Sequence, residues 1–172
     1  MNSVIIQDYD PRWPHLFEAL RSRIESVIHG MAAAVEHVGS TAVPGLAAKP
    51  VIDIDVLLRS DTDLPVVIAR LASIGYEHRG DLGVTGREAF RTPPSDVPHH
   101  LYVCPSNSSE YKRHILFRDY LRAHPVDANS YASLKRELVR TLGHDREAYT
   151  KAKSGFVAEI LRRVDKIATN TE

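Results

Sequence analysis

Two aspartates stand two residues apart in an otherwise apolar stretch of this chain. Asp53 and Asp55 lie within Val51–Leu58, whose aliphatic and mostly β-branched side chains are typical of a buried strand. Because side chains alternate along a strand, we expect both carboxylates on one face. Neighbouring buried carboxylates repel each other and lose hydration, and a cation between them offsets this cost. We therefore predict that Asp53 and Asp55 are catalytic residues that bind Mg²⁺ or Mn²⁺. The alternative is a strand end whose acids face water.

A glycine–serine turn precedes these acids. Gly39, Ser40 and Thr41 follow the run Ala33–His37, which is typical of a strand, and twelve residues separate Ser40 from Asp53. Gly39 would let the backbone approach a phosphate, and Ser40 would offer hydroxyl and amide donors. We therefore expect Gly39, Ser40 and Thr41 to contact the phosphates of a nucleotide. A common turn in which Ser40 only caps a helix is the structural alternative.

The glycine–serine turn, the twelve residues after Ser40 and the strand that carries Asp53 and Asp55, which we call the acid strand, together resemble the signature of polymerase-β-like nucleotidyltransferases. More specifically, His37–Leu46 and Lys49–Ile54 closely resemble the GrpB family, which is usually placed in that superfamily. The resemblance implies a nucleotidyltransferase fold. Some family members are fused to dephospho-coenzyme A kinase, which implies a functional link to coenzyme A biosynthesis. The likeness covers nearly the whole chain and continues through Tyr9–Pro11, Trp13, Gly75-Tyr76, His99–Leu101, Phe117–Pro125, Tyr131–Lys135, Tyr149 and Lys153.

Polymerase-β-like enzymes usually have a third carboxylate on a later strand, and the corresponding run His99–Cys104 contains no acid. Alternation places His100 and Tyr102 on one face of this run, so His100 is the catalytic candidate for the space near the metal. The family pattern usually has a second histidine where this chain has Tyr102, which removes a potential ligand or base. A hydrogen bond within the sheet is the alternative role of His100. Glu88 and Asp96 are fallback carboxylates surrounded by turns.

Three cationic side chains are candidates for binding the triphosphate. Lys49 precedes the strand of Asp53 and Asp55, with Pro50 between them, and Arg118 offers a guanidinium fork that matches phosphate geometry. Lys153 falls on the apolar stripe of the last predicted helix and could point into a cleft. Alternatively, Lys49 is only a solvated residue at the start of the strand, and Arg118 only forms a surface ion pair worth ~0.2–1 kcal/mol. Lys153 would then reach water from an apolar face. For Lys135, which is placed similarly, we favour the last interpretation.

Bulk composition limits the classes of partner. Lysine plus arginine and aspartate plus glutamate both number 22 among 172 residues, so the net charge is zero with histidine neutral. Nothing indicates a basic surface, and nucleic acid is not an expected partner. The single cysteine, Cys104, excludes an internal disulfide and fits a reducing compartment. No apolar run approaches membrane-spanning length and no leader-like segment is seen, so we expect a cytoplasmic protein without a membrane partner.

Hydrophobic periodicity predicts an α+β protein with a nucleotidyltransferase-like small mixed sheet flanked by helices and a helical C-terminal part. Residues 1–107 are expected to form the α/β core and residues 108–172 the helical part, packed together as one compact domain. After the acid strand, short strands are expected near Tyr76–Arg79, Arg87–Thr92 and His99–Cys104. Helices are expected up to about His29, before Gly75, and over Ser108–Ala123, Pro125–Leu142 and Asp145–Lys166.

These features support two functional hypotheses. The leading one is a metal-dependent nucleotidyltransferase that transfers a nucleoside monophosphate from an NTP, with ATP as the expected substrate, to an unknown small-molecule or protein acceptor. The alternative is a catalytically inactive module of the same fold that binds nucleotides or proteins. The missing third acid and the kinase fusions of the family favour this alternative.

Overall fold

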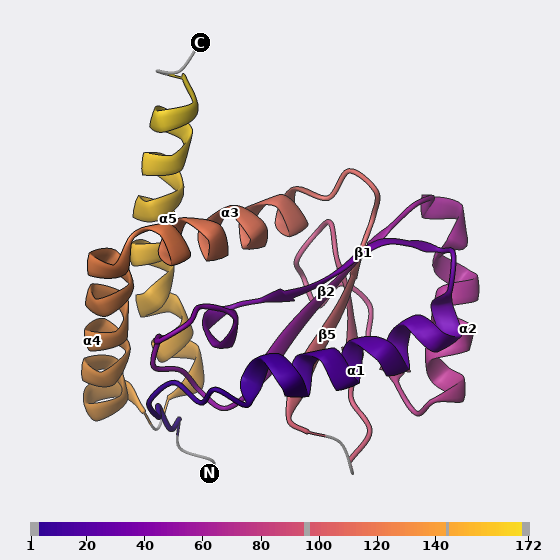
Figure 1. Cartoon of the computed structure of the whole chain (residues 1–172), viewed down its shortest axis with the longest axis horizontal. Coiled ribbons are helices and arrows are strands. Elements are labelled where there is room, and N and C mark those ends of the chain that lie inside the picture. The colour runs from indigo at the N-terminus through magenta and orange to yellow at the C-terminus, as the bar shows by residue number, and fades with distance from the viewer. Residues whose placement is uncertain (1–3, 95–96, 144, 170–172) are drawn as a thin grey trace.

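The computed structural model describes residues 4–94, 97–143 and 145–169, and Asp96 therefore lies outside the described residues. Within this part of the chain, five strands form one sheet in the order β1-β2-β5-β4-β3 (Figure 1). Strands β2 and β5 run parallel, whereas the other neighbours pair antiparallel, which confirms the expected mixed sheet. The strands are β1 (Ala32–Val38), β2 (Ile52–Leu58), β3 (Glu77–His78), β4 (Glu88–Arg91) and β5 (His99–Cys104).

The helices lie in two groups around this sheet (Figure 1). Helices α1 and α2 lie beside the sheet. Helices α4 and α5 stand together at one end of the molecule, and α3 runs from them toward the strands. Helix α5 projects beyond the rest of the molecule. This arrangement confirms the predicted α+β class with a helical C-terminal part. Their bounds are α1 (Trp13–Ile28), α2 (Leu64–Ser73), α3 (Ser109–Ala123), α4 (Pro125–Leu142) and α5 (Arg146–Thr169), with short 3₁₀ turns η1 (Ser40–Ala42) and η2 (Asp61–Asp63).

One face of β2 belongs to the main hydrophobic core, and this orients the two acids. Ile52, Ile54, Val56 and Leu58 are all buried in the cluster that α1 and α2 share with the sheet. Full burial of one such side chain contributes about 1.5–3 kcal/mol. A register slip of one residue would turn this whole set away from the core. The same alternation directs the intervening aspartates to the opposite face.

A second apolar cluster holds the segment after η1 against the helical part. Val43 and Leu46 pack with Leu121 of α3 and with Tyr131 and Ala132 of α4. This packing brings the glycine–serine turn next to α4. Side chains from the second half of the chain can therefore reach the acid strand.

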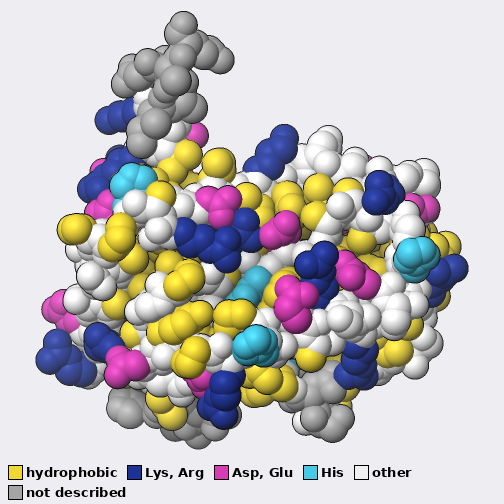
Figure 2. All heavy atoms as spheres, viewed as in Figure 1, with side chains coloured by type: hydrophobic (Ala, Val, Ile, Leu, Met, Phe, Trp, Pro, Cys, Tyr) yellow, Lys and Arg dark blue, Asp and Glu magenta, His cyan; other side chains and the backbone are white. Residues whose placement is uncertain are grey.

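The exposed face seen in Figure 2 carries acidic and basic side chains interspersed with apolar ones. No extended patch of a single sign is visible on that face. Among the helices of the described residues, none is long and apolar enough to cross a membrane.

Candidate functional site

Two aspartate–histidine pairs form the centre of the site. The side chain of Asp53 is 30% exposed, and its Oδ1 accepts a hydrogen bond of 2.7 Å from Nδ1 of His100 on β5. Asp55 is fully buried, with 0% of its surface exposed, and its Oδ2 accepts a 2.7 Å hydrogen bond from Nδ1 of His114 on α3. The parallel register of β2 and β5 places His100 directly opposite Asp53. The structure thus brings the predicted residues Asp53, Asp55 and His100 together.

The buried pair is electrostatically unusual. Burial raises the pKa of Asp55 above its ordinary value, although the hydrogen bond from His114 opposes this shift. For His114, burial lowers the pKa, but the hydrogen bond to Asp55 and the charge of that carboxylate outweigh burial and raise the pKa overall. The second oxygen of Asp55, Oδ1, is buried and has no hydrogen-bond partner within the described structure. A bound cation would satisfy such an oxygen.

The donor set fits a hard divalent cation. Among residues 4–94, 97–143 and 145–169, no group of three or more His, Cys, Asp or Glu side chains is arranged to hold a metal. The chain therefore supplies two carboxylates, Asp53 and Asp55. Mg²⁺ is commonly held by one or two carboxylates, with substrate phosphates and water as its remaining ligands.

Gly39 places the turn directly against the acid strand. Its φ of +72° lies in the left-handed region, and a Cβ atom at this position would lie 2.2 Å from Oδ2 of Asp53. Only glycine accommodates both the backbone conformation and the close approach. In the η1 turn that follows, the amides of Ala42 and Val43 donate to the carbonyl oxygens of Gly39 and Ser40, whereas the first amides have no acceptor within the turn. The hydroxyl group of Thr41 is already engaged, because Oγ1 lies 2.9 Å from Nε2 of His37.

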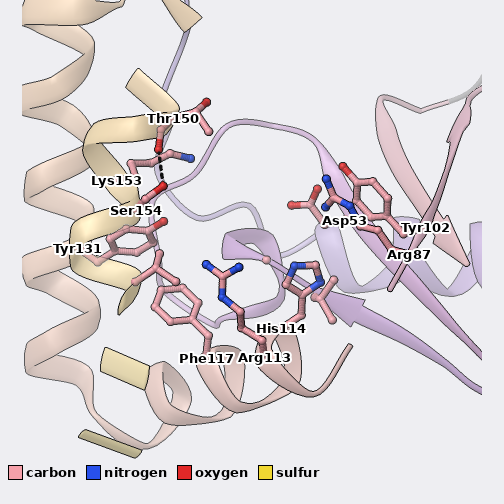
Figure 3. A pocket seen from close by; sticks show the side chains of 13 residues that line it. Asp53, Arg87, Tyr102, Arg113, His114, Phe117, Tyr131, Thr150, Lys153 and Ser154 are labelled. Carbon is pink, nitrogen blue, oxygen red and sulfur yellow. Dashed lines mark hydrogen bonds between the residues drawn. The ribbon is translucent and has the colours of Figure 1, made fainter. Parts of the chain in front are cut away.

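Two cavities meet at Asp53. We call the one lined by Ser40 the serine lobe and the one lined by Arg113 the arginine lobe. The serine lobe has a volume of about 330 Å³, and the arginine lobe has a volume of about 320 Å³. Both are lined by Asp53, Arg87, Tyr102, Thr150 and Lys153. The serine lobe adds Ser40, Thr41, Lys49, His100, Lys135 and Tyr149, and the arginine lobe, drawn in Figure 3, adds Gly39, Arg113, His114, Phe117, Tyr131 and Ser154.

Lys135 is a member of the site that sequence reasoning missed. Its side chain is only 2% exposed, so the expectation that it reaches water is wrong. Nζ donates hydrogen bonds to Oγ of Ser40 at 2.9 Å and to the carbonyl oxygen of Ala47 at 2.5 Å. Burial lowers the pKa of Lys135 to about 7, and the nearby charges of Lys153 and Arg136 act in the same direction. The apolar face of α4 that carries Lys135 packs on the segment after η1, so the amine lies inside the protein and does not reach water.

The three cations predicted to bind the triphosphate are divided by the fold. Lys49 and Lys153 both line the serine lobe. Arg118 lines neither lobe, because its Nη1 donates to Oε2 of Glu36 at 2.7 Å and to the carbonyl oxygen of His37 at 3.0 Å. Its Nε also donates to Asp119. One helical turn earlier on α3, His114 reaches the acids instead. Arg118 is therefore committed to β1 and not to the two lobes.

Other carboxylates near the acid strand are committed elsewhere. Glu36 of β1 lies directly opposite Asp55 in the sheet, but it forms an ion pair with Arg118. Glu88, one fallback acid, lies opposite Val103 rather than Tyr102 and has its Oε2 2.6 Å from Nε2 of His78. Neither acid completes a three-carboxylate metal site in the described structure.

Arg87 was also missed as a site residue, although the sequence predicts a short strand from Arg87 to Thr92 and Arg87 directly precedes the observed β4. Its guanidinium carbon lies 4.2 Å from the centre of the Tyr102 ring, and its Nε is buried without a hydrogen-bond partner in the described residues. The local pattern predicted this strand but gave no signal of the cavity that Arg87 faces.

Comparison with known proteins places this geometry in a family. The GrpB protein family model matches residues 3–163. The UPF0157 protein of Halalkalibacterium halodurans is 39% identical over 164 residues, which cover 95% of this chain and 83% of that protein. The crystal structure of the conserved protein GrpB from Enterococcus faecalis superposes with a TM-score of 0.86 at 32% identity, over 95% of this chain and 99% of that one.

A more distant neighbour confirms the fold alone. Terminal uridylyl transferase 4 from Trypanosoma brucei with bound UTP superposes with a TM-score of 0.51 at 17% identity. The match covers 91% of this chain and 52% of that enzyme. The fold is therefore nucleotidyltransferase-like, and the chain belongs to the GrpB family.

Proposed function

We propose that this GrpB-family protein is a metal-dependent nucleotidyltransferase, which transfers a nucleoside monophosphate from an NTP to a small-molecule or protein acceptor. One observation carries the proposal. Asp53 borders a cavity lined by several cations, and the buried Asp55, two residues along the same strand, has a carboxylate oxygen that lacks a partner in the described residues. Such an arrangement suits a polyphosphate that arrives with a divalent cation.

The serine lobe is the proposed binding site of the triphosphate. Ser40 and the amides that follow it face the phosphate oxygens, and Lys49 and Lys153 supply positive charge around them. Lys135 adds its charge when the triphosphate binds, because a neighbouring anion raises the pKa of a lysine. Asp53 and Asp55 would hold Mg²⁺ or Mn²⁺, which when bound neutralises charge at the reacting phosphate. We take ATP as the first substrate to test.

The chain's own residues then perform positioning and proton transfer. The acceptor oxygen attacks the α-phosphorus, the bond to the β-phosphate oxygen breaks, and pyrophosphate leaves. Lys49, Lys135 and Lys153 stabilise the charge of this leaving group. His100 donates through Nδ1 to Asp53, so Nε2 of the neutral ring can take the acceptor's proton.

Incubation with α-labelled ATP, Mg²⁺ and a panel of acceptors that includes coenzyme A precursors tests the proposal. We expect transfer of the label with release of pyrophosphate, and we expect Asp53→Asn to abolish both. The matched control is Asp8→Asn, because the Asp8 side chain is 91% exposed and remote from β2 in the sequence. Loss of activity in both variants, or retention in both, would contradict the assigned role of Asp53.

A second candidate function has one observation in its favour. Glu36, the carboxylate opposite Asp55, is held by Arg118, which leaves two acids at the metal position. A module that binds nucleotide without turnover would need no more than these. It would be stabilised thermally by ATP with Mg²⁺ and would release no pyrophosphate. In either case the free, buried thiol of Cys104 fits the proposed location in the reducing cytoplasm.

A further inference from the structure

The arginine lobe carries cationic groups on two walls. Figure 3 shows Arg113 of α3 pointing into the cavity from one side, with Arg87 and Tyr102 beside Asp53 on another. The Arg113 side chain is 44% exposed, and its distances of 3.4 and 3.5 Å to the carboxylate of Glu110 describe a loose surface pair. Such a pair contributes little to the stability of the fold and leaves the guanidinium group of Arg113 available to a ligand.

Arg87 is less exposed than Arg113, and no ion pair with a carboxylate is formed by its side chain in the part of the chain that the structure describes. Its guanidinium group lies over the ring of Tyr102, which fixes its plane, and its buried Nε makes no hydrogen bond within the described residues. A buried donor without a partner is costly, and an anionic ligand would satisfy it. The arginine stacked on an aromatic ring is thus prepared for a planar, two-point contact.

The charge balance of the arginine lobe is positive once the nucleotide is accounted for. Among the described residues that line it, Asp53 alone is acidic, and the proposed function assigns that carboxylate to the metal. Lys153 is assigned to the triphosphate, and His114 is bound to Asp55. Arg87, which directly precedes β4, and Arg113 of α3 therefore remain. Phe117, Tyr131 and Val157 give the lobe an apolar wall. Two separate guanidinium groups beside apolar surface match a dianion on a small organic body better than a neutral group.

We propose that the arginine lobe is the acceptor site, and that the acceptor is a small molecule with a hydroxyl group and a phosphate monoester. This inference rests on the proposed function and names its second substrate by class. The phosphate monoester binds Arg87 and Arg113, and the hydroxyl group faces Asp53, where the two lobes meet. The hydroxyl oxygen bonds to the α-phosphorus, pyrophosphate leaves with the broken P–O bond, and the hydroxyl proton passes to His100.

Calorimetric titration with paired probes tests the acceptor site. The protein is first saturated with Mn²⁺ and a non-hydrolysable ATP analogue, and then titrated with glycerol 3-phosphate or with glycerol. We expect glycerol 3-phosphate to bind and glycerol not to bind. Arg113→Gln should weaken glycerol 3-phosphate at least about tenfold, and Arg113→Lys, which keeps the charge without the fork, by less. Lys112→Gln is the matched control on the same helix, and its affinity should stay within about twofold of the wild type.

The outcomes separate the two proposals. If the ATP analogue binds and glycerol 3-phosphate does not, the acceptor class is wrong and the proposed function stands. If Arg113→Gln weakens the ATP analogue as much as glycerol 3-phosphate, the arginine lobe holds the nucleotide, and the acceptor site is overturned. If the ATP analogue itself does not bind with Mn²⁺, the proposed function fails, and the acceptor site fails with it. Equal effects of the Lys112 and Arg113 variants also overturn the acceptor site.

Discussion

Replacing Lys135 with methionine is predicted to stabilise this protein near neutral pH while weakening its binding of nucleotide. Lys135 is almost fully buried, and it donates hydrogen bonds to Ser40 and to the carbonyl oxygen of Ala47. Methionine fills a similar volume without a charge. The variant loses two hydrogen bonds, worth together about 2 kcal/mol, but it also escapes the cost of removing the proton of Lys135 on folding.

The sign of the pH dependence follows from the lowered pKa. Burial lowers the pKa of Lys135 to about 7 from an ordinary value of 10.5, so between these values the unfolded chain binds a proton that the folded chain does not. Stability of the wild type must therefore rise with pH across this window, and fall as pH drops toward 7. The two pKa values give a rise of about 2.5 kcal/mol between pH 8 and pH 10 from this one group.

The variant lacks this dependence. The gain from removing the proton cost exceeds the loss of the two hydrogen bonds at pH 8 and falls short of it at pH 10. Lys135→Met should therefore be more stable than the wild type by about 1 kcal/mol at pH 8, and less stable by about 1 kcal/mol at pH 10. Urea unfolding at both pH values measures the difference, with the exposed Lys112→Met as the matched control. At pH 7.5 the affinity of Lys135→Met for the non-hydrolysable ATP analogue with Mn²⁺ should be about tenfold or more below that of the wild type. A difference in stability that does not change with pH would refute the reasoning.

Two further predictions concern the acid strand. Gly39→Ala should destabilise the fold by about 2 kcal/mol and abolish label transfer, because the added Cβ meets Asp53. Gly45→Ala is the control, since Gly45 has a similar φ of +79° but open space around the added atom. Equal losses of stability of the two variants in urea unfolding would contradict this reasoning. His114→Leu should cost about 3 kcal/mol by leaving the buried Asp55 carboxylate unpaired. Adding Asp55→Asn should recover most of that loss in thermal unfolding, and strictly additive effects would count against the pair.

The acid strand and its neighbour could be predicted from local pattern. Four alternating aliphatic residues identify the core face of β2, and the same alternation determines the face of Asp53 and Asp55. His100 was expected near Asp53 because its run corresponds to the strand that carries the third carboxylate in polymerase-β-like enzymes, and the parallel pairing of β2 with β5 places it there. The glycine–serine turn could be predicted for the same reason, since it depends on residues close in the sequence.

The cations were harder to assign, because their partners are distant in the sequence. Lys135 and Arg118 both lie on amphipathic helices, and a helical pattern gives the face of a side chain but not the element it meets. Packing of α4 on the segment after η1 turned Lys135 inward to Ser40, and the crossing of α3 over β1 delivered Arg118 to Glu36. Arg87 precedes a four-residue strand, too short for its facing to be read from periodicity.

Anomalous diffraction at the manganese edge, from crystals grown with Mn²⁺ and a non-hydrolysable ATP analogue, tests the central claim most directly. We predict a manganese peak between the carboxylates of Asp53 and Asp55, in contact with Oδ1 of Asp55, with the triphosphate in the serine lobe. A nucleotide bound elsewhere, or a manganese ion that leaves both aspartates untouched, would contradict it.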